Sequence, residues 1–210
     1  DSAFTNHRPS SVAVKHAGSS IYVRSRAFVL NGTLIANGDS AFNASSSSRG
    51  TVVVVSGSSH IVGSMFRFNN MARGVGGALF LDGNGPHLVE DTWFVNNTIK
   101  GNGAGLVADG SVTMRRSVFI NNTAVPDTVS CRGAAFYGAG QNANYLIEKN
   151  FFKDNECSWG GPHLRFESGF STYTAVINNN TFYGGGGSFG DKLYFGSTGH
   201  SATLTNNLFL

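Results

Sequence analysis

Charged residues are scarce in this chain of 210 residues: Asp, Glu, Lys and Arg make up 13% of it, about half of their share in an average soluble domain. Disordered chains combine many charges with few aromatic residues, whereas this chain has 17 Phe. Its 28 Gly residues indicate many tight turns. The composition therefore excludes a disordered tail and favours short, buried strands joined by turns.

The chain also lacks the features that bind nucleic acids or metals, or that span membranes. Its net charge is only +3 and Arg115–Arg116 is the one adjacent basic pair, so no basic stripe could follow a phosphate backbone. The His residues are dispersed, so we expect no metal site, and no motif predicts a cofactor. No run of about 18 apolar residues exists, which excludes a membrane-spanning helix.

What the chain has instead is a repeat. The residue five positions before each repeated Phe is apolar, and the residues three and two positions before it are not. From Phe66 onward, the successive Phe residues are 28, 25, 33, 30 and 27 positions apart, and Phe182 and Phe209 continue the series without an Asn in register. The copies of the Phe-x-x-Asn motif are Phe28–Asn31, Phe66–Asn69, Phe94–Asn97, Phe119–Asn122 and Phe152–Asn155. Such columns are typical of stacked coils.

A second block, in which small residues precede a short apolar run, lies between the Phe motifs. Its clearest copies are Gly77–Gly83 and Ala104–Gly110, and weaker ones follow further on. Asp82 and Asp109, each before a Gly, are predicted to form turns. Each repeat therefore holds two or three short strands.

One repeat cannot bury its own apolar face, but coils stacked about 4.8 Å apart bury the Phe column continuously. The sequence predicts an all-β fold, a right-handed parallel β-helix of about seven coils, as a single domain over residues 1–210. We expect a less regular lead-in at 1–20 and a Ser-rich insertion at 38–60. A β-propeller is the rival, but its blades need roughly 40 residues. Both ends resemble cuts from a longer chain or processed termini.

The paired Phe-x-x-Asn and Gly-Gly-Ala motifs resemble those of the chlamydial polymorphic outer-membrane proteins and, more widely, the right-handed β-helices of the pectin-lyase-like superfamily. The resemblance covers about residues 20–210, and its best matches are Phe94–Thr98 and Phe119–Thr123. It implies a surface-exposed or secreted adhesin or scaffold segment. Enzymes and passive stalks share this coil, so the motifs are specific for the fold and weak for function.

The repeated side chains predict two structural ladders. The Phe residues should stack inside the coil, and each repeated Asn should bond its copy one rung away, with a polar binding stripe as the functional alternative. The ladder residues are Phe66, Phe94, Phe119 and Phe152 with Asn97, Asn122 and Asn155.

Cys131 and Cys157 are the only cysteines and are 26 residues apart, about one coil. Stacked rungs would bring their Cα atoms to the separation that a disulfide needs, so we predict a bridge. A bridge favours an oxidising compartment.

Glycosylation sequons occur at Asn31, Asn43, Asn96, Asn121 and Asn179. Asn96 and Asn121 share one repeat position, predicted at a coil edge that faces water. They are the preferred glycan sites if the producing cell is eukaryotic.

Charges also fall into columns. Glu90–Asp91, Arg115–Arg116 and Glu148–Lys149 occupy matching positions on three successive rungs, which predicts a surface ladder of ion pairs. The functional alternative takes Glu90 and Asp91 as catalytic or calcium-binding carboxylates, with Arg115 or Arg116 as the base. A β-helical polysaccharide lyase would need such a set. Against it, the chain lacks the Asn-Thr-Asp, Asp-Asp, Gly-His-Gly and Arg-Ile-Lys motifs by which galacturonan hydrolases of this fold resemble one another.

We therefore expect an extracellular structural or adhesive segment, which displays glycans or contacts carbohydrate through aromatics such as Trp93 or Trp159. Its expected partners are further coils, a cap or another copy, joined through strand edges. A carbohydrate-active lyase or hydrolase is the alternative.

Overall fold

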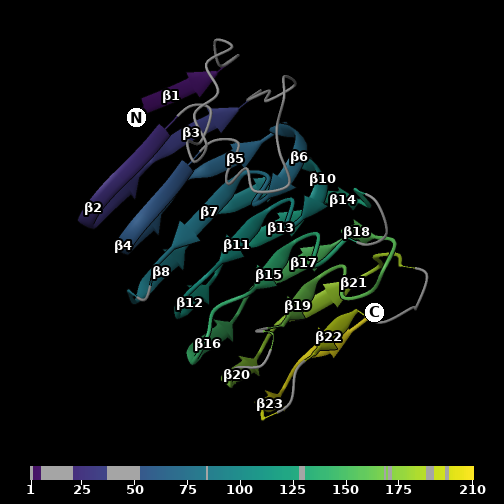
Figure 1. Ribbon diagram of the computed structural model, residues 1–210. Helices are drawn as coiled ribbons and strands as arrows, with labels where there is room; N and C mark the ends of the chain where they lie inside the picture. The colour runs from purple at the N-terminus through teal and green to yellow at the C-terminus, as the bar shows by residue number, and fades with distance from the viewer. Residues whose placement is uncertain are drawn as a thin grey trace.

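The computed structural model describes residues 2–5, 21–36, 53–83, 85–127, 131–167, 169, 172–187, 192–196 and 199–210. All regular elements in these ranges are β-strands, and they pair in parallel as a β-solenoid of about 5 turns (Figure 1). The predicted parallel β-helix is thereby confirmed. Most of the predicted lead-in and Ser-rich insertion, including Asn43, lies outside the described residues.

An eight-stranded sheet forms one wall of the coil. Each of its middle strands is only three residues long, because a buried Phe flanked by two outward residues is enough to span this side. In spatial order its strands are β1 (Ser2–Thr5), β3 (Thr33–Ala36), β5 (Met65–Arg67), β9 (Trp93–Val95), β13 (Val118–Ile120), β17 (Phe151–Lys153), β21 (Thr181–Tyr183) and β24 (Leu208–Phe209).

A four-stranded sheet follows along the chain and forms the next wall. Its members are β6 (Asn70–Val75), β10 (Thr98–Asn102), β14 (Thr123–Val125) and β18 (Glu156–Cys157).

A twelve-stranded sheet closes the coil with two rows of strands, which the long strands β2 (Ile21–Asn31) and β4 (Val53–Val62) join. The first row, built from the Gly-Ala blocks, contains β7 (Leu79–Asp82), β11 (Leu106–Ala108), β15 (Phe136–Gly138), β19 (Leu164–Phe166) and β22 (Leu193–Phe195). The second row contains β8 (His87–Glu90), β12 (Val112–Arg115), β16 (Ala143–Glu148), β20 (Tyr173–Asn178) and β23 (Ser201–Thr205).

The predicted Phe column runs through the core. Phe66, Phe94, Phe119 and Phe152 are fully buried, and their ring centroids lie 4.9, 4.6 and 5.1 Å apart with nearly parallel planes. Phe182 and Phe209 extend the stack at 4.9 and 5.0 Å. The rings repeat at the strand spacing because each occupies the central position of a paired strand.

Two predictions about the first coils were wrong. Phe28 does not belong to the Phe column: it pairs with Ser59 in β4, and the neighbour of Phe66 in the column is Ile35. The expected seven coils are about 5, because that count assigned one full coil to every Phe, including Phe28. The motif at Phe28–Asn31 is therefore a local coincidence within the long strand β2.

Two corners, before and after the eight-stranded sheet, place a residue in the left-handed region on every rung. At the first corner Asp91, Arg116, Lys149 and Asn179 have φ between 51° and 57°. At the second corner Asn96, Asn121 and Asp154 have φ between 48° and 54°. A single left-handed residue turns the chain sharply, which explains why Asn and Asp are frequent at these positions.

Candidate functional site

The second corner holds the predicted Asn ladder. Asn97 Nδ2 donates to Asn122 Oδ1, and Asn122 Nδ2 donates to Asn155 Oδ1, each at 2.9 Å. The same amides donate to the main-chain oxygens of Phe66 and Phe94, and Asn69 starts the series at 2.9 Å from Asn97. All four side chains are fully buried. The amides satisfy one another and the turn, so they form no open binding stripe.

The ladder ends on His163, a residue outside the Phe-x-x-Asn motifs. Asn155 Nδ2 lies 3.2 Å from His163 Nδ1, and His163 Nε2 lies 3.1 Å from the Gly184 oxygen. The first contact needs Nδ1 as an acceptor and the second needs Nε2–H as a donor, which together define the neutral imidazole. Burial accordingly lowers the pKa of His163 to about 4.

A second ladder, at the first corner, was missed. Asn150 Nδ2 donates to Asn180 Oδ1 at 3.1 Å, and Asn180 Nδ2 donates to Asn207 Oδ1 at 3.1 Å. On earlier rungs a side-chain hydroxyl stands in place of the Asn side chain. The main-chain N–H of Thr92, for example, donates to Ser117 Oγ at 3.2 Å. The signal was present in the sequence, since all these residues lie two positions before the repeated Phe.

The charged residues at the first corner form one cluster rather than an extended ladder. Glu90 accepts hydrogen bonds from Arg115 Nε and Arg116 NH2, both at 2.7 Å, and lies 2.8 Å from His60 Nε2. Arg116 also binds Asp91 through two bonds of 2.8 and 2.9 Å. Among the described residues, no ion pair joins Arg115 to Glu148 on the neighbouring strand β16. The third rung of the predicted ladder is therefore absent.

These contacts fix the ionisation of the cluster. The Arg115 hydrogen bond is the main cause that lowers the pKa of Glu90 to about 2, and Arg116 lowers the pKa of Asp91. Asp91 in turn raises the pKa of Arg116. A general acid needs a raised carboxyl pKa and a general base needs an uncharged nitrogen. The four residues proposed for catalysis are thus brought together, but in a state that suits an ion-pair network.

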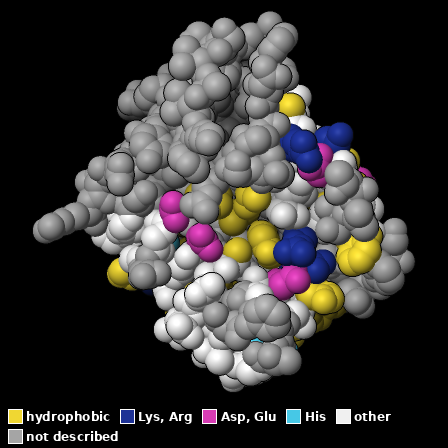
Figure 2. All heavy atoms as spheres, viewed as in Figure 1, with side chains coloured by type: hydrophobic (Ala, Val, Ile, Leu, Met, Phe, Trp, Pro, Cys, Tyr) yellow, Lys and Arg dark blue, Asp and Glu magenta, His cyan; other side chains and the backbone are white. Residues whose placement is uncertain are grey.

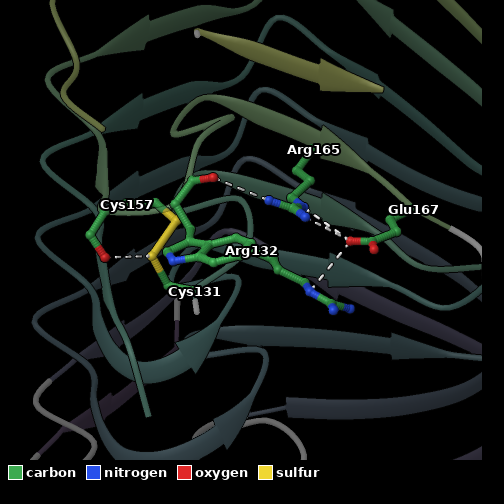
Figure 3. The surroundings of a disulfide bond; sticks show 7 residues. Cys131, Arg132, Cys157, Arg165 and Glu167 are labelled. Carbon is green, nitrogen blue, oxygen red and sulfur yellow. Dashed lines mark hydrogen bonds and ion pairs between the residues drawn. A yellow bond between two sulfur atoms is a disulfide. The ribbon is translucent and has the colours of Figure 1, made fainter. Parts of the chain in front are cut away.

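The predicted disulfide joins Cys131 to Cys157, whose Cα atoms lie 5.9 Å apart on neighbouring rungs. Beside it, Arg132 and Arg165 both approach Glu167 (Figure 3): Arg165 NH2 lies 2.9 Å and Arg132 Nε 3.3 Å from the same carboxylate oxygen. Two guanidinium groups share one carboxylate, so this cluster has an excess of positive charge.

Aromatic rings surround the excess positive charge. The Arg165 guanidinium lies 4.0 Å from the centroid of Tyr194, and Arg132 NH1 donates to Tyr137 Oη at 3.2 Å. Trp159, whose oxygen accepts from Arg165 at 3.5 Å, is 42% exposed. We call Arg132, Trp159, Arg165, Glu167 and Tyr194 the arginine–aromatic surface.

This surface borders a small apolar cluster on the outside of the coil. Phe80, Val107 and Tyr137 point away from the core column of β7, β11 and β15 and pack against one another. Figure 2 shows apolar side chains near the centre of the view, with acidic and basic side chains beside them. All three apolar side chains are buried, so the cluster supports the arginine–aromatic surface from below.

An open groove of about 410 Å³ lies further along the wall, over β12, β16 and β20. Ser111, Thr113, Asn144 and Thr174 supply hydroxyl and amide groups to it, and Leu146 and Val176 supply apolar surface. Most of the accessible lining is nevertheless apolar, so the groove offers few groups to a polar ligand.

The described sequons lie at turns or directly before one. Asn96 and Asn121 share the second corner, as expected, and Asn121 is exposed whereas Asn96 is half-buried. Asn179 is exposed at the first corner, and Asn31 is exposed at the end of β2. The left-handed backbone turns the side chains of Asn96 and Asn121 away from the ladder formed by the residues that follow them.

Comparison of the chain with family models, curated proteins and solved structures finds no match. The described part contains no group of three or more His, Cys, Asp or Glu placed to hold a metal ion. Within the same ranges no helix has the length and apolar character to cross a bilayer. The class that the structure defines is a parallel β-solenoid with internal repeats and one disulfide.

Proposed function

We propose that this chain is a structural or adhesive segment of an extracellular protein, in which the coil is a rigid support and its outer surface makes the contacts. One observation carries the proposal: the buried Asn side chains are committed to two continuous ladders, and Arg115 and Arg116 neutralise the carboxylates of the catalytic alternative. The disulfide supports an oxidising compartment. The resemblance to surface-exposed adhesin segments points in the same direction.

The arginine–aromatic surface is the proposed site of carbohydrate contact. Trp159 offers an exposed ring on which a sugar face can stack, and Arg132, 37% exposed, can donate to sugar hydroxyl or carboxylate oxygens. The disulfide holds Cys157, two residues before Trp159, to the neighbouring rung. The ring is thus presented in a fixed position, which lowers the entropic cost of binding.

Titration of immobilised neutral and acidic polysaccharides with the intact chain tests this contact. Trp159→Ala should weaken binding at least tenfold, whereas Trp93→Ala, a matched change of the other Trp on a different wall, should leave it unchanged. Equal affinity of both variants, or no binding to any polysaccharide, would contradict the assignment of this surface.

The alternative function is a polysaccharide lyase or hydrolase, supported by the clustering of Glu90, Asp91, Arg115 and Arg116 at one corner. Incubation of the same polysaccharides with the chain, with and without calcium, distinguishes the two functions. We expect no new reducing ends and no unsaturated products. Turnover that Asp91→Asn or Arg116→Gln abolishes would replace the scaffold proposal with the enzyme.

Two further properties belong to the proposal. Asn96 and Asn121 carry N-linked glycans when a eukaryotic cell secretes the chain, which a mass shift on glycosidase treatment would reveal.

The terminal strands β23 and β24 each pair on one side only and expose Leu204 and Leu208, so further coils, a cap or a second copy can add there. A monodisperse monomer at high concentration would argue against self-association.

A further inference from the structure

The outer face of the eight-stranded sheet is apolar. Because side chains alternate along a strand, the Phe residues point inward and the residues on either side of each Phe point outward. The first outward column contains Met65, Trp93, Val118 and Phe151 on four successive strands. Trp93 is 45% exposed and the other three are partly exposed, so the column borders solvent.

The second outward column places two cations among apolar residues. Arg67, Val95, Ile120 and Lys153 follow one another, and Tyr183 comes next at 46% exposure. From β5 to β21 neither column contains an Asp or Glu. Lys153 Nζ lies 3.9 Å from Asp154 at the second corner, in an exposed and therefore weak pair.

The charged group of each cation lies close to an aromatic ring. The Arg67 guanidinium lies 5.9 Å from the Phe68 centroid, and Lys153 Nζ lies 5.5 Å from the Tyr183 centroid. Such side chains lay their aliphatic stems along apolar surface and hold the charged ends at its border. The face therefore combines apolar side chains with two cations that stand in its second column.

The size of this face limits what can cover it. The five strands from β5 to β21, about 4.8 Å apart, and two columns about 7 Å apart give an area on the order of 200 Å². Each partner in a stable protein complex buries about 800 Å², so the face is too small for a protein dimer by itself. It also has few hydrogen-bonding groups, which a sugar ligand would need.

We propose that this face docks on the surface of an anionic lipid bilayer. The apolar columns enter the boundary between headgroups and acyl chains, where Trp93 and Tyr183 are the preferred ring types. Arg67 and Lys153 contact the anionic headgroups. The proposal does not depend on the carbohydrate contact, which lies on another wall of the coil.

Vesicle flotation of the intact chain tests the docking. Vesicles of phosphatidylcholine with phosphatidylserine should bind the chain at low salt, and vesicles of phosphatidylcholine alone should bind it much more weakly. The double variant Arg67→Gln/Lys153→Gln should lower partitioning by roughly 30-fold, because each cation near an anionic surface contributes about 1 kcal/mol. The control Lys100→Gln/Lys149→Gln removes the same net charge outside the face and should change partitioning little.

Fluorescence then identifies the wall that binds. The chain has only two Trp, so Trp159→Phe leaves Trp93 as the sole reporter and Trp93→Phe leaves Trp159. Anionic vesicles should shift the emission of Trp93 to the blue and leave that of Trp159 unchanged. No binding, equal losses in both double variants, or a shift of Trp159 alone would overturn the proposal. So would a dimer or a polysaccharide complex that protects Trp93 instead.

Discussion

Gly185 leaves open the space that the His163 ring occupies. A Cβ at Gly185 would lie 2.6 Å from His163 Nε2, and the Gly185 φ of +83° also favours Gly. Gly185 follows Phe182 by three positions, the place that Asn155 occupies after Phe152. The coil that lacks its ladder Asn thus receives an imidazole from His163, eight residues beyond Asn155.

The neutral state of His163 makes stability depend on pH. The folded pKa of about 4 lies below the 6.5 of the unfolded chain, so the unfolded chain binds more protons between these values. The free energy of unfolding should therefore fall by about 3 kcal/mol as pH decreases from 7 to 4. Urea titrations at several pH values measure this fall. His163→Gln, which keeps an acceptor and a donor without titrating, should flatten the profile, and His60→Gln should not.

Replacing Asn122 by Leu should destabilise the fold strongly. The change removes the side-chain donor to the buried Phe94 oxygen and to Asn155 Oδ1, and it removes the acceptor of the Asn97 main-chain N–H and Nδ2. We expect the free energy of unfolding to fall by about 3–4 kcal/mol. Asn121→Gly, at the neighbouring exposed left-handed position, is the control and should be neutral or stabilising. An unchanged melting temperature for Asn122→Leu would refute the structural role of the ladder.

Glu90→Gln should cost more than Asp91→Asn. The Glu90 side chain is 10% exposed and accepts from two Arg residues, whereas Asp91 and Arg116 are both exposed. At pH 7 we expect losses of about 2 kcal/mol for Glu90→Gln and less than about 1 kcal/mol for Asp91→Asn. The folded pKa of Glu90 is lowered from 4.5 to about 2, so its contribution is present above 4.5 and disappears as pH falls toward 2. The difference in the free energy of unfolding between Glu90→Gln and the unchanged chain should therefore disappear as the pH approaches about 2.

Reduction of the Cys131–Cys157 disulfide should lower stability without unfolding the coil. Its loop of 26 residues corresponds to about 3.5 kcal/mol of chain entropy in the unfolded state. Melting with and without a reductant, beside the Cys131→Ser/Cys157→Ser variant, measures the effect. The mass of the oxidised chain should be lower by two hydrogens, and two free thiols in secreted material would contradict the bridge.

The sequence predicted those features that repeat at one register. Phe94 and Phe119 stack, and Asn97 and Asn122 bond, because identical residues at one position of stacked coils must meet. The bridge between Cys131 and Cys157 follows from the same logic.

The sequence could not predict features that depend on irregular steps of the chain. Phe28 satisfies the motif locally, yet the register shift of β2 against β4 places it opposite Ser59. His60 is not next to Glu90 in any repeat position, because β4 pairs His60 with Leu88 and the long side chain reaches across to Glu90. The charged residues of the arginine–aromatic surface were missed because each occurs once: Arg165, for example, occupies the register position at which the neighbouring strands carry Tyr137 and Tyr194.

Both ladders have one polarity: Asn69, Asn97 and Asn122 each donate to the Asn of the following coil, and so do Asn150 and Asn180. Each coil therefore accepts a hydrogen bond from the coil before it and donates one to the coil after it. The 25-residue unit that separates Asn97 from Asn122 could be duplicated between them, since the copy would accept at one side and donate at the other. After Asn155, the acceptor of the ladder hydrogen bond is the imidazole of His163 and not another Asn. A coil copied into this position would therefore compete with His163 for Asn155, so the imidazole limits where coils can be added by internal duplication.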